Sequence, residues 1–224
     1  MPKSLPFSSS VNRLPNGNIE LTLTIPWAKM QQGYEQVIVE TIKNTEMKGF
    51  RKGFAPRKLV EERLDRNQTF SHALQHLLPP AYQAAVDKHG LKPVVYPHIR
   101  IAKGNEGEDW VLTAVLCEAP IVRLGKLTAD LDQLLKNSEV LLADLIVEQE
   151  ADHRLGQLAE NLTQLGVSVD KYLTSKKLTS PQLRAKLASE ARRDLSMEFI
   201  LHRVQVEHKL PDRQKTLDFL QDLE

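Results

Sequence analysis

Hydrophobic and polar residues alternate strictly over residues 19–25 (Ile-Glu-Leu-Thr-Leu-Thr-Ile). A period of two is typical of a half-buried β-strand, so this segment predicts a strand. Residues 15–18 (Pro-Asn-Gly-Asn) form a turn cluster with the Asn-Gly pair of a hairpin, and residues 8–14 predict the partner strand. Residues 94–101 and 110–118 predict two further strands, joined by a glycine-containing turn.

A helical period predicts the elements between these strands. One helix begins near Pro26 and carries apolar residues three and four positions apart. A short helix over residues 57–65 and a longer one over residues 70–89 follow. Pro79-Pro80 is expected to kink or divide the longer helix, because proline lacks the N–H that the helix needs. Together these elements predict an α+β domain over residues 1–124.

Beyond Leu124 the strand patterns stop and leucines recur at helical spacing. Gly166 is expected to end one helix, and Ser168 can cap a short one after it. Thr179-Ser-Pro-Gln combines a capping box with a proline in the first turn, and predicts a helix to about His208. A last helix follows Pro211, so residues 125–224 predict an all-α domain.

Composition narrows the class of protein. The apolar fraction of 41% and charged fraction of 26% are those of ordinary soluble proteins. The longest apolar run, residues 111–117, is too short to cross a membrane, and the N-terminus lacks the apolar core of a signal peptide. Cys117, the single cysteine, permits no internal disulfide, so the cytoplasm is the expected compartment.

The loop at residues 49–56 (Gly-Phe-Arg-Lys-Gly-Phe-Ala-Pro) concentrates unusual chemistry between two predicted helices. Glycine and proline give it a fixed shape, and no acidic residue occurs from Met47 to Val60. Cations together with aromatic rings suit a polyanion such as RNA or a ribonucleoprotein. The alternative is a solvated basic turn whose phenylalanines fold back into the core.

The same loop resembles the Gly-Phe-Arg-x-Gly-x-x-Pro pattern of trigger factor, the bacterial chaperone at the ribosomal tunnel exit. Gly49, Phe50, Arg51, Gly53 and Pro56 meet every fixed position. Residue 54, often basic in that family, is a phenylalanine here. The order of predicted strands and helices is also similar to that of the family's ribosome-binding domain.

The second half resembles the family's chaperone domain, most closely over residues 164–173, Gln-Leu-Gly-Val-Ser-Val-Asp-Lys-Tyr-Leu. The family normally carries an FK506-binding-type prolyl isomerase domain between its two halves. Here only residues 124–137 could hold it, and they are too few for a domain. The resemblance therefore implies a short chaperone that works without ATP, any cofactor or isomerase activity.

The resemblance also implies site residues and partners. The implied docking partner is the large ribosomal subunit, contacted near the tunnel exit on its rRNA and protein. The implied docking residues are Gly49, Phe50, Arg51, Lys52, Gly53 and Pro56. Binding of nascent or unfolded polypeptides would fall to apolar residues of the helical half, namely Leu158, Leu162, Leu165, Leu187, Leu195, Phe199 and Ile200. Such apolar stripes are equally expected of simple core packing, or of closure by a homodimer.

Two other functions stay open. An RNA- or protein-binding adaptor could keep the docking loop without binding clients, and an isomerase could be hidden in the helical half. No metal site is expected, because His72 and His76 share a predicted helix face but lack a third ligand nearby.

Overall fold

The computed structural model of the protein describes residues 7–46 and 50–223, which fall into two compact units. Within those residues, the first unit comprises 7–12, 19–46, 50–92 and 96–116, and the second comprises 13–18, 93–95 and 117–223. The first is mixed α and β and the second is mainly helical, which confirms the predicted fold class. The boundary expected at residue 124 stays a prediction.

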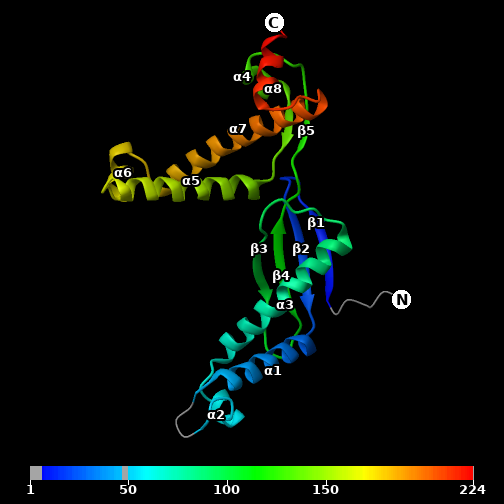
Figure 1. The fold of residues 1–224 in the computed structure, drawn as a ribbon, viewed down its shortest axis with the longest axis vertical. Coiled ribbons are helices and arrows are strands. Elements are labelled where there is room, and N and C mark those ends of the chain that lie inside the picture. The colour runs from blue at the N-terminus through cyan, green and yellow to red at the C-terminus, as the bar shows by residue number, and fades with distance from the viewer. Residues whose placement is uncertain (1–6, 47–49, 224) are drawn as a thin grey trace. The chain divides into compact units, whose positions relative to one another are not determined.

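An antiparallel sheet forms one layer of the first unit (Figure 1). Its strands lie in the order β1-β2-β4-β3. Their bounds are β1 Ser8–Arg13, β2 Ile19–Ile25, β3 His98–Lys103 and β4 Trp110–Leu116. The alternating segment is strand β2 over its whole predicted length, and it pairs with β4 so that Ile19 faces Leu116 and Ile25 faces Trp110.

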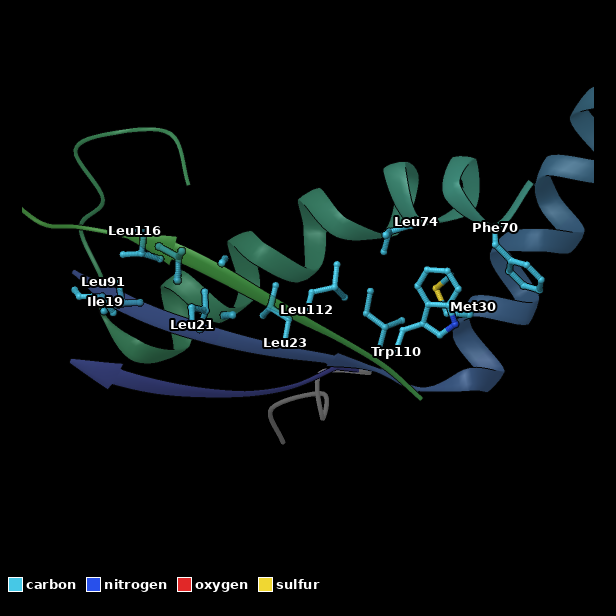
Figure 2. Close-up of a cluster of buried hydrophobic side chains, with 14 residues drawn as sticks. Ile19, Leu21, Leu23, Met30, Phe70, Leu74, Leu91, Trp110, Leu112 and Leu116 are labelled. Atoms are coloured by element: carbon cyan, nitrogen blue, oxygen red, sulfur yellow. The ribbon is translucent and has the colours of Figure 1, made fainter. Parts of the chain in front are cut away.

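Helices form the other layer. They are α1 Trp27–Asn44, α2 Arg57–Glu61 and α3 Arg66–His89. Apolar side chains of β2 and β4 point toward α3, as Figure 2 shows, and α1 packs against α3. The core contains, among others, Leu21, Leu23, Met30, Leu74, Leu112 and Leu116, all at most 7% exposed. Burying a side chain of this size stabilises the fold by about 1.5–3 kcal/mol.

Helix α3 differs from its prediction at its start and at its prolines. Asp65, expected inside the preceding short helix, is instead the N-cap of α3, and its carboxylate accepts from the Gln68 N–H. The helix also continues through Pro79 and Pro80, so these prolines do not divide it, and the other expected outcome, a kink, stays a prediction. Both prolines and the residues four positions before them are exposed, so water can solvate the carbonyls that lose a helical partner.

Strand β3 begins at His98, four residues later than predicted, and all six of its residues are exposed. Pro93 and Pro97 bracket the part that was expected to be strand, and a proline cannot donate to a ladder. The strand lies at an edge of the sheet, and its register with β4 shifts between Ile101 and Lys103.

The second unit is built around a long helix, α7. Its elements are β5 Ile121–Arg123, α4 Leu131–Asn137, β6 Glu139–Leu141, α5 Asp144–Gln164, α6 Val169–Lys176, α7 Ser180–Glu207 and α8 Arg213–Gln221. Strands β5 and β6 form an antiparallel ribbon. The expectation of no strand beyond Leu124 is therefore wrong for β6, whose three residues are too few to show a period.

Helices α5 and α7 lie side by side, with α6 joining them at one end (Figure 1). The predicted caps are confirmed: Thr179 and Gln182 form a reciprocal capping box, and the Ser168 hydroxyl accepts from the Lys171 N–H. Around the other part of α7, a small cluster buries Leu134, Ile200, Leu201, Val204 and Leu220.

Charged side chains also join α5 to α7. Arg154 of α5 bridges Glu150, at 2.7 Å on its own helix, and Asp194 of α7 at 2.9 Å. Arg184 and Arg192 of α7 pair with carboxylates of α5 in the same way. In the part of the chain that is described, no helix is long and apolar enough to cross a membrane.

Candidate functional site

The loop between α1 and α2 has a backbone shape that its sequence dictates. Gly53 has a φ of +82°, which residues with a side chain rarely adopt, and the Phe54 N–H donates to the Arg51 carbonyl at 3.0 Å. These two features are those of a tight turn with glycine in its third position. Pro56 follows as the N-cap of α2, so two of the fixed positions are structural.

A small apolar anchor holds the end of this turn. Ala55 is 6% exposed and Val60 of α2 is 3% exposed, and both pack against Ile42 and Leu64. Ala55 therefore points inward while its neighbours do not.

The remaining side chains of the loop face solvent. Phe54 is 71% exposed and Phe50 is 41% exposed, and both Arg51 and Lys52 are exposed. The Arg51 guanidinium carbon lies over the Phe54 ring, 6.0 Å from its centroid, which is a cation–π distance. For these described residues, the alternative in which the phenylalanines fold back into the core is therefore wrong for Phe54, and Phe50 is also exposed.

Arg57 plays a different part from its basic neighbours. It pairs with Glu35 of α1 and with Glu61 of α2, each at 2.7 Å, and its guanidinium lowers the pKa of the Glu35 carboxyl. Arg57 thus links two helices. Within the described chain, no carboxylate lies within 4.0 Å of the charged groups of Arg51, Lys52 or Lys58.

The loop therefore presents charge that its own fold does not neutralise. Gly49 and the preceding Lys48 and Met47 lie outside the described residues. Phe54 and Lys58 belong to the same surface, although the sequence analysis did not assign them to it. The sequence leaves open whether the Phe54 ring is exposed or buried. The run without acidic residues, which includes Lys58, is the sequence signal that could have assigned Lys58 to this basic surface.

The apolar residues expected to bind clients divide by burial. Ile200 is fully buried and Leu162 is 7% exposed, so both serve the core of the helical unit. Four others are half-buried, namely Leu158, Leu187, Leu195 and Phe199. Leu165, by contrast, is 75% exposed.

Leu165 lies in the turn between α5 and α6. The Gly166 N–H donates to Thr163 and the Val167 N–H donates to Leu162, the hydrogen bonds of a Schellman motif. A Schellman motif is commonly accompanied by an apolar contact between the residues in the positions of Leu162 and Val167, but it does not call for an apolar residue in the position of Leu165. Val167 and Val169 are also more than one-third exposed, so an apolar patch surrounds this turn.

Other chemistry is sparse in the described chain. An open groove of about 480 Å³ is lined by the aromatic residues Trp27, Tyr34 and Phe70. Its lining also contains both members of two ion pairs, Arg57–Glu35 and Arg66–Glu106. Among the residues described, His, Cys, Asp and Glu form no group of three that could hold a metal ion. Burial raises the pKa of the Cys117 thiol to about 11, so that thiol stays protonated.

Two family models match the chain, and the first of them extends from the α+β unit into the helical unit. Residues 7–153 match the bacterial trigger factor protein, and residues 126–217 match the trigger factor C-terminus. The first match alone covers more than half of the chain, so the chain belongs to the trigger factor family. Because the two matches overlap, the chain passes from one to the other with no domain between them.

Curated relatives agree with this assignment. Trigger factor of Listeria monocytogenes is 34% identical over an alignment of 149 positions, which covers 60% of this chain and 35% of that protein. Trigger factor of Staphylococcus aureus is 33% identical over 141 residues, 62% of this chain and 32% of that protein. The chain thus spans about one-third of the length of these relatives.

A solved structure of the trigger factor chaperone, from work on promiscuous substrate recognition in folding and assembly, covers 68% of this chain and 35% of its own. The identity is 16% and the TM-score is 0.40, so the family assignment rests on the sequence matches.

Proposed function

We propose that this protein is a ribosome-associated chaperone of the cytoplasm that binds nascent or unfolded polypeptides and has no isomerase activity. The observation that carries the proposal is the geometry of the loop at residues 50–56. Its glycine and proline form the turn, while Phe50, Arg51 and Lys52 face solvent. Family membership supports the same role.

Docking would combine charge with one apolar anchor. Arg51 and Lys52 are not neutralised by carboxylates of the described fold, so they can pair with phosphates or acidic groups of the large ribosomal subunit near its tunnel exit. Phe50 supplies an apolar contact beside them. Since the turn is already formed, little ordering is needed on binding, which favours affinity.

Client binding would use the helical unit. The patch at Leu165, Val167 and Val169 and the half-buried leucines of α5 and α7 offer apolar contacts without directional hydrogen bonds. Such contacts suit many unrelated sequences at low affinity. A homodimer that covers these residues is the competing use of the same surface.

Replacement of Phe50, Arg51 and Lys52 together by Ala tests docking. Because all three side chains are exposed, the fold should survive, and co-sedimentation with large ribosomal subunits should fall by at least about tenfold, the loss of two phosphate contacts and an anchor. Replacement of Lys171 and Lys176 by Ala is the control, since it removes the same charge from exposed positions of α6. Equal binding by the folded loop variant would disprove docking through this loop.

Client binding has its own test. Leu165→Ser should weaken suppression of aggregation of an unfolded protein and leave the unfolding midpoint unchanged, because the side chain is largely exposed. Leu223→Ser, at an exposed leucine near the chain end, is the control. If the wild-type protein docks but suppresses no aggregation, the adaptor function replaces the chaperone function. A proline-peptide assay above background would reveal an isomerase.

A further inference from the structure

The Phe54 ring has no role in the fold that contains it. It is 71% exposed, and in the described chain no other aromatic ring stacks on it. Its neighbour Ala55 provides the apolar anchor of the loop. One exposed apolar side chain needs no explanation by itself. This ring, however, lies on a preformed turn among cations that no carboxylate of the described residues pairs with.

The turn fixes the direction of that ring. The Phe54 N–H donates to Arg51, and Gly53 holds the positive φ that closes the turn. The Arg51 guanidinium then covers one face of the ring at 6.0 Å, and the ring keeps an open side. We call the ring and this guanidinium the Arg51–Phe54 platform.

Two kinds of partner could receive this platform: an apolar pocket of a protein, or the bases of single-stranded RNA. An apolar pocket that enclosed the ring would also remove water from the guanidinium beside it. Burying a charge in that way is costly without a paired anion. A nucleotide avoids this cost, because its base stacks on the ring while its phosphate stays with the charge.

The charges around the platform favour the nucleotide. Lys52 lies within the same turn and Lys58 lies on α2, and neither has a carboxylate within ion-pair distance in the described residues. Aromatic rings among unneutralised cations are the usual means by which proteins hold single-stranded nucleic acid.

From this combination we infer that Phe54 stacks on an unpaired base of RNA, and that Arg51 and Lys52 contact the adjoining phosphates. The inference rests on the proposed docking function and specifies the chemistry of its partner: an exposed single-stranded segment of ribosomal RNA.

A short RNA tests the stacking directly. The probe is fluorescein-labelled oligo(A) of about ten nucleotides, and the matched control is the same ribose-phosphate chain without bases. Fluorescence anisotropy at about 50 mM salt gives each dissociation constant. The wild-type protein should bind oligo(A) about five- to hundredfold more tightly than the abasic chain. Equal affinity for both would overturn the inference.

Two substitutions separate stacking from plain apolar contact. Phe54→Trp keeps a flat ring, so its preference for oligo(A) should equal or exceed that of the wild type. Phe54→Leu keeps apolar surface but no ring, so its preference should be lost. The exposure of residue 54 allows both proteins to fold, which circular dichroism checks. The reverse order, with the preference for oligo(A) retained by Phe54→Leu and lost by Phe54→Trp, would refute stacking.

The same variants on large ribosomal subunits distinguish this failure from failure of the proposed function. If the wild-type protein co-sediments with the subunits and Phe54→Leu binds them as well as Phe54→Trp does, the docking function is supported and the stacking inference is refuted. If wild-type protein does not co-sediment, docking falls, and the stacking inference falls with it.

Discussion

The two units of the protein bury their apolar residues in different ways. In the α+β unit, β2, β4 and α3 contribute to one continuous core that contains both tryptophans, Trp27 at its margin and Trp110 within it. In the helical unit, one cluster surrounds part of α7, and a second set of buried apolar residues lies along α5, where ion pairs also join it to α7, namely Leu145, Ile146, Val147, Ala151 and Leu162.

This difference would suit the two kinds of binding proposed above. The loop of the α+β unit is held in a fixed shape by its own small apolar anchor, which would suit one partner of constant structure. A helix pair with half-buried leucines can shift its packing at small cost, which suits partners with no common sequence. The predictions below test this contrast, beginning with the largest effect.

Leu112→Ala should have the largest effect. The side chain is fully buried between strands and helix, so its loss should cost about 2–5 kcal/mol. Both tryptophans belong to the α+β unit, so their fluorescence during urea unfolding reports on this unit alone. Leu187→Ala, at a half-buried leucine of α7, should cost only about 1 kcal/mol when followed by circular dichroism. Equal losses would mean that the helical unit is as tightly packed as the other.

Gly53→Ala should come next. An added methyl group meets the Lys43 carbonyl oxygen at 3.5 Å and the Lys43 Cα at 3.8 Å, which are ordinary contacts, so the cost of about 1–2 kcal/mol comes from the positive φ. Gly156→Ala is the matched control, because Gly156 lies within α5 with open space around it and should gain about 0.5–1 kcal/mol. A harmless Gly53→Ala would show that the loop is not held in this shape.

Arg154→Gln tests the charged contacts between α5 and α7. Its bridge from Glu150 to Asp194 is partly buried, so the loss should be about 0.5–1 kcal/mol and should shrink at high salt. Arg203→Gln, which removes a pair confined to α7, should change little. Thermal unfolding followed by circular dichroism measures both, and equal shifts would mean that the bridge between helices adds nothing.

Phe54→Lys should have the smallest effect on folding. The ring is largely exposed, so the unfolding free energy should change by less than about 0.5 kcal/mol. Urea unfolding followed by tryptophan fluorescence checks this. A loss of about 2 kcal/mol or more would place the ring in a core.

Local patterns predicted most of the fold. Strand β2 and the capping box at Thr179 were predicted in full, because each is written in a few adjacent residues with a defined spacing. The predictions that were wrong concern features that depend on residues far away in the sequence. The start of β3 depends on where β4 can pair with it, and the passage of α3 through Pro79 depends on which helix face meets water.

For the candidate site, as for the fold, the local features could be predicted from the sequence and the long-range contacts could not. The sequence identified the loop through the spacing of its glycines and proline, and those positions have structural roles in the part described. It could not show that Arg57 is committed to Glu35 and Glu61, because Glu35 is 22 residues away. Nor could it separate the buried Ile200 from the exposed Leu165, since both fit a helical stripe.

The edge strand β3 affects the tendency of this protein to aggregate at high concentration. An edge strand offers free hydrogen-bonding groups to any other chain, and Ile99 and Ile101 are exposed on this one. The register shift after Ile101 distorts the edge of β3, so a regular strand of another chain cannot pair with it along its whole length. Arg100 and Lys103 place charged groups on this edge, where they pair with Glu20 at 3.7 Å and Glu108 at 3.0 Å. Pairing of two copies through this edge would have to disturb or desolvate these ion pairs, which disfavours fibril-like stacking.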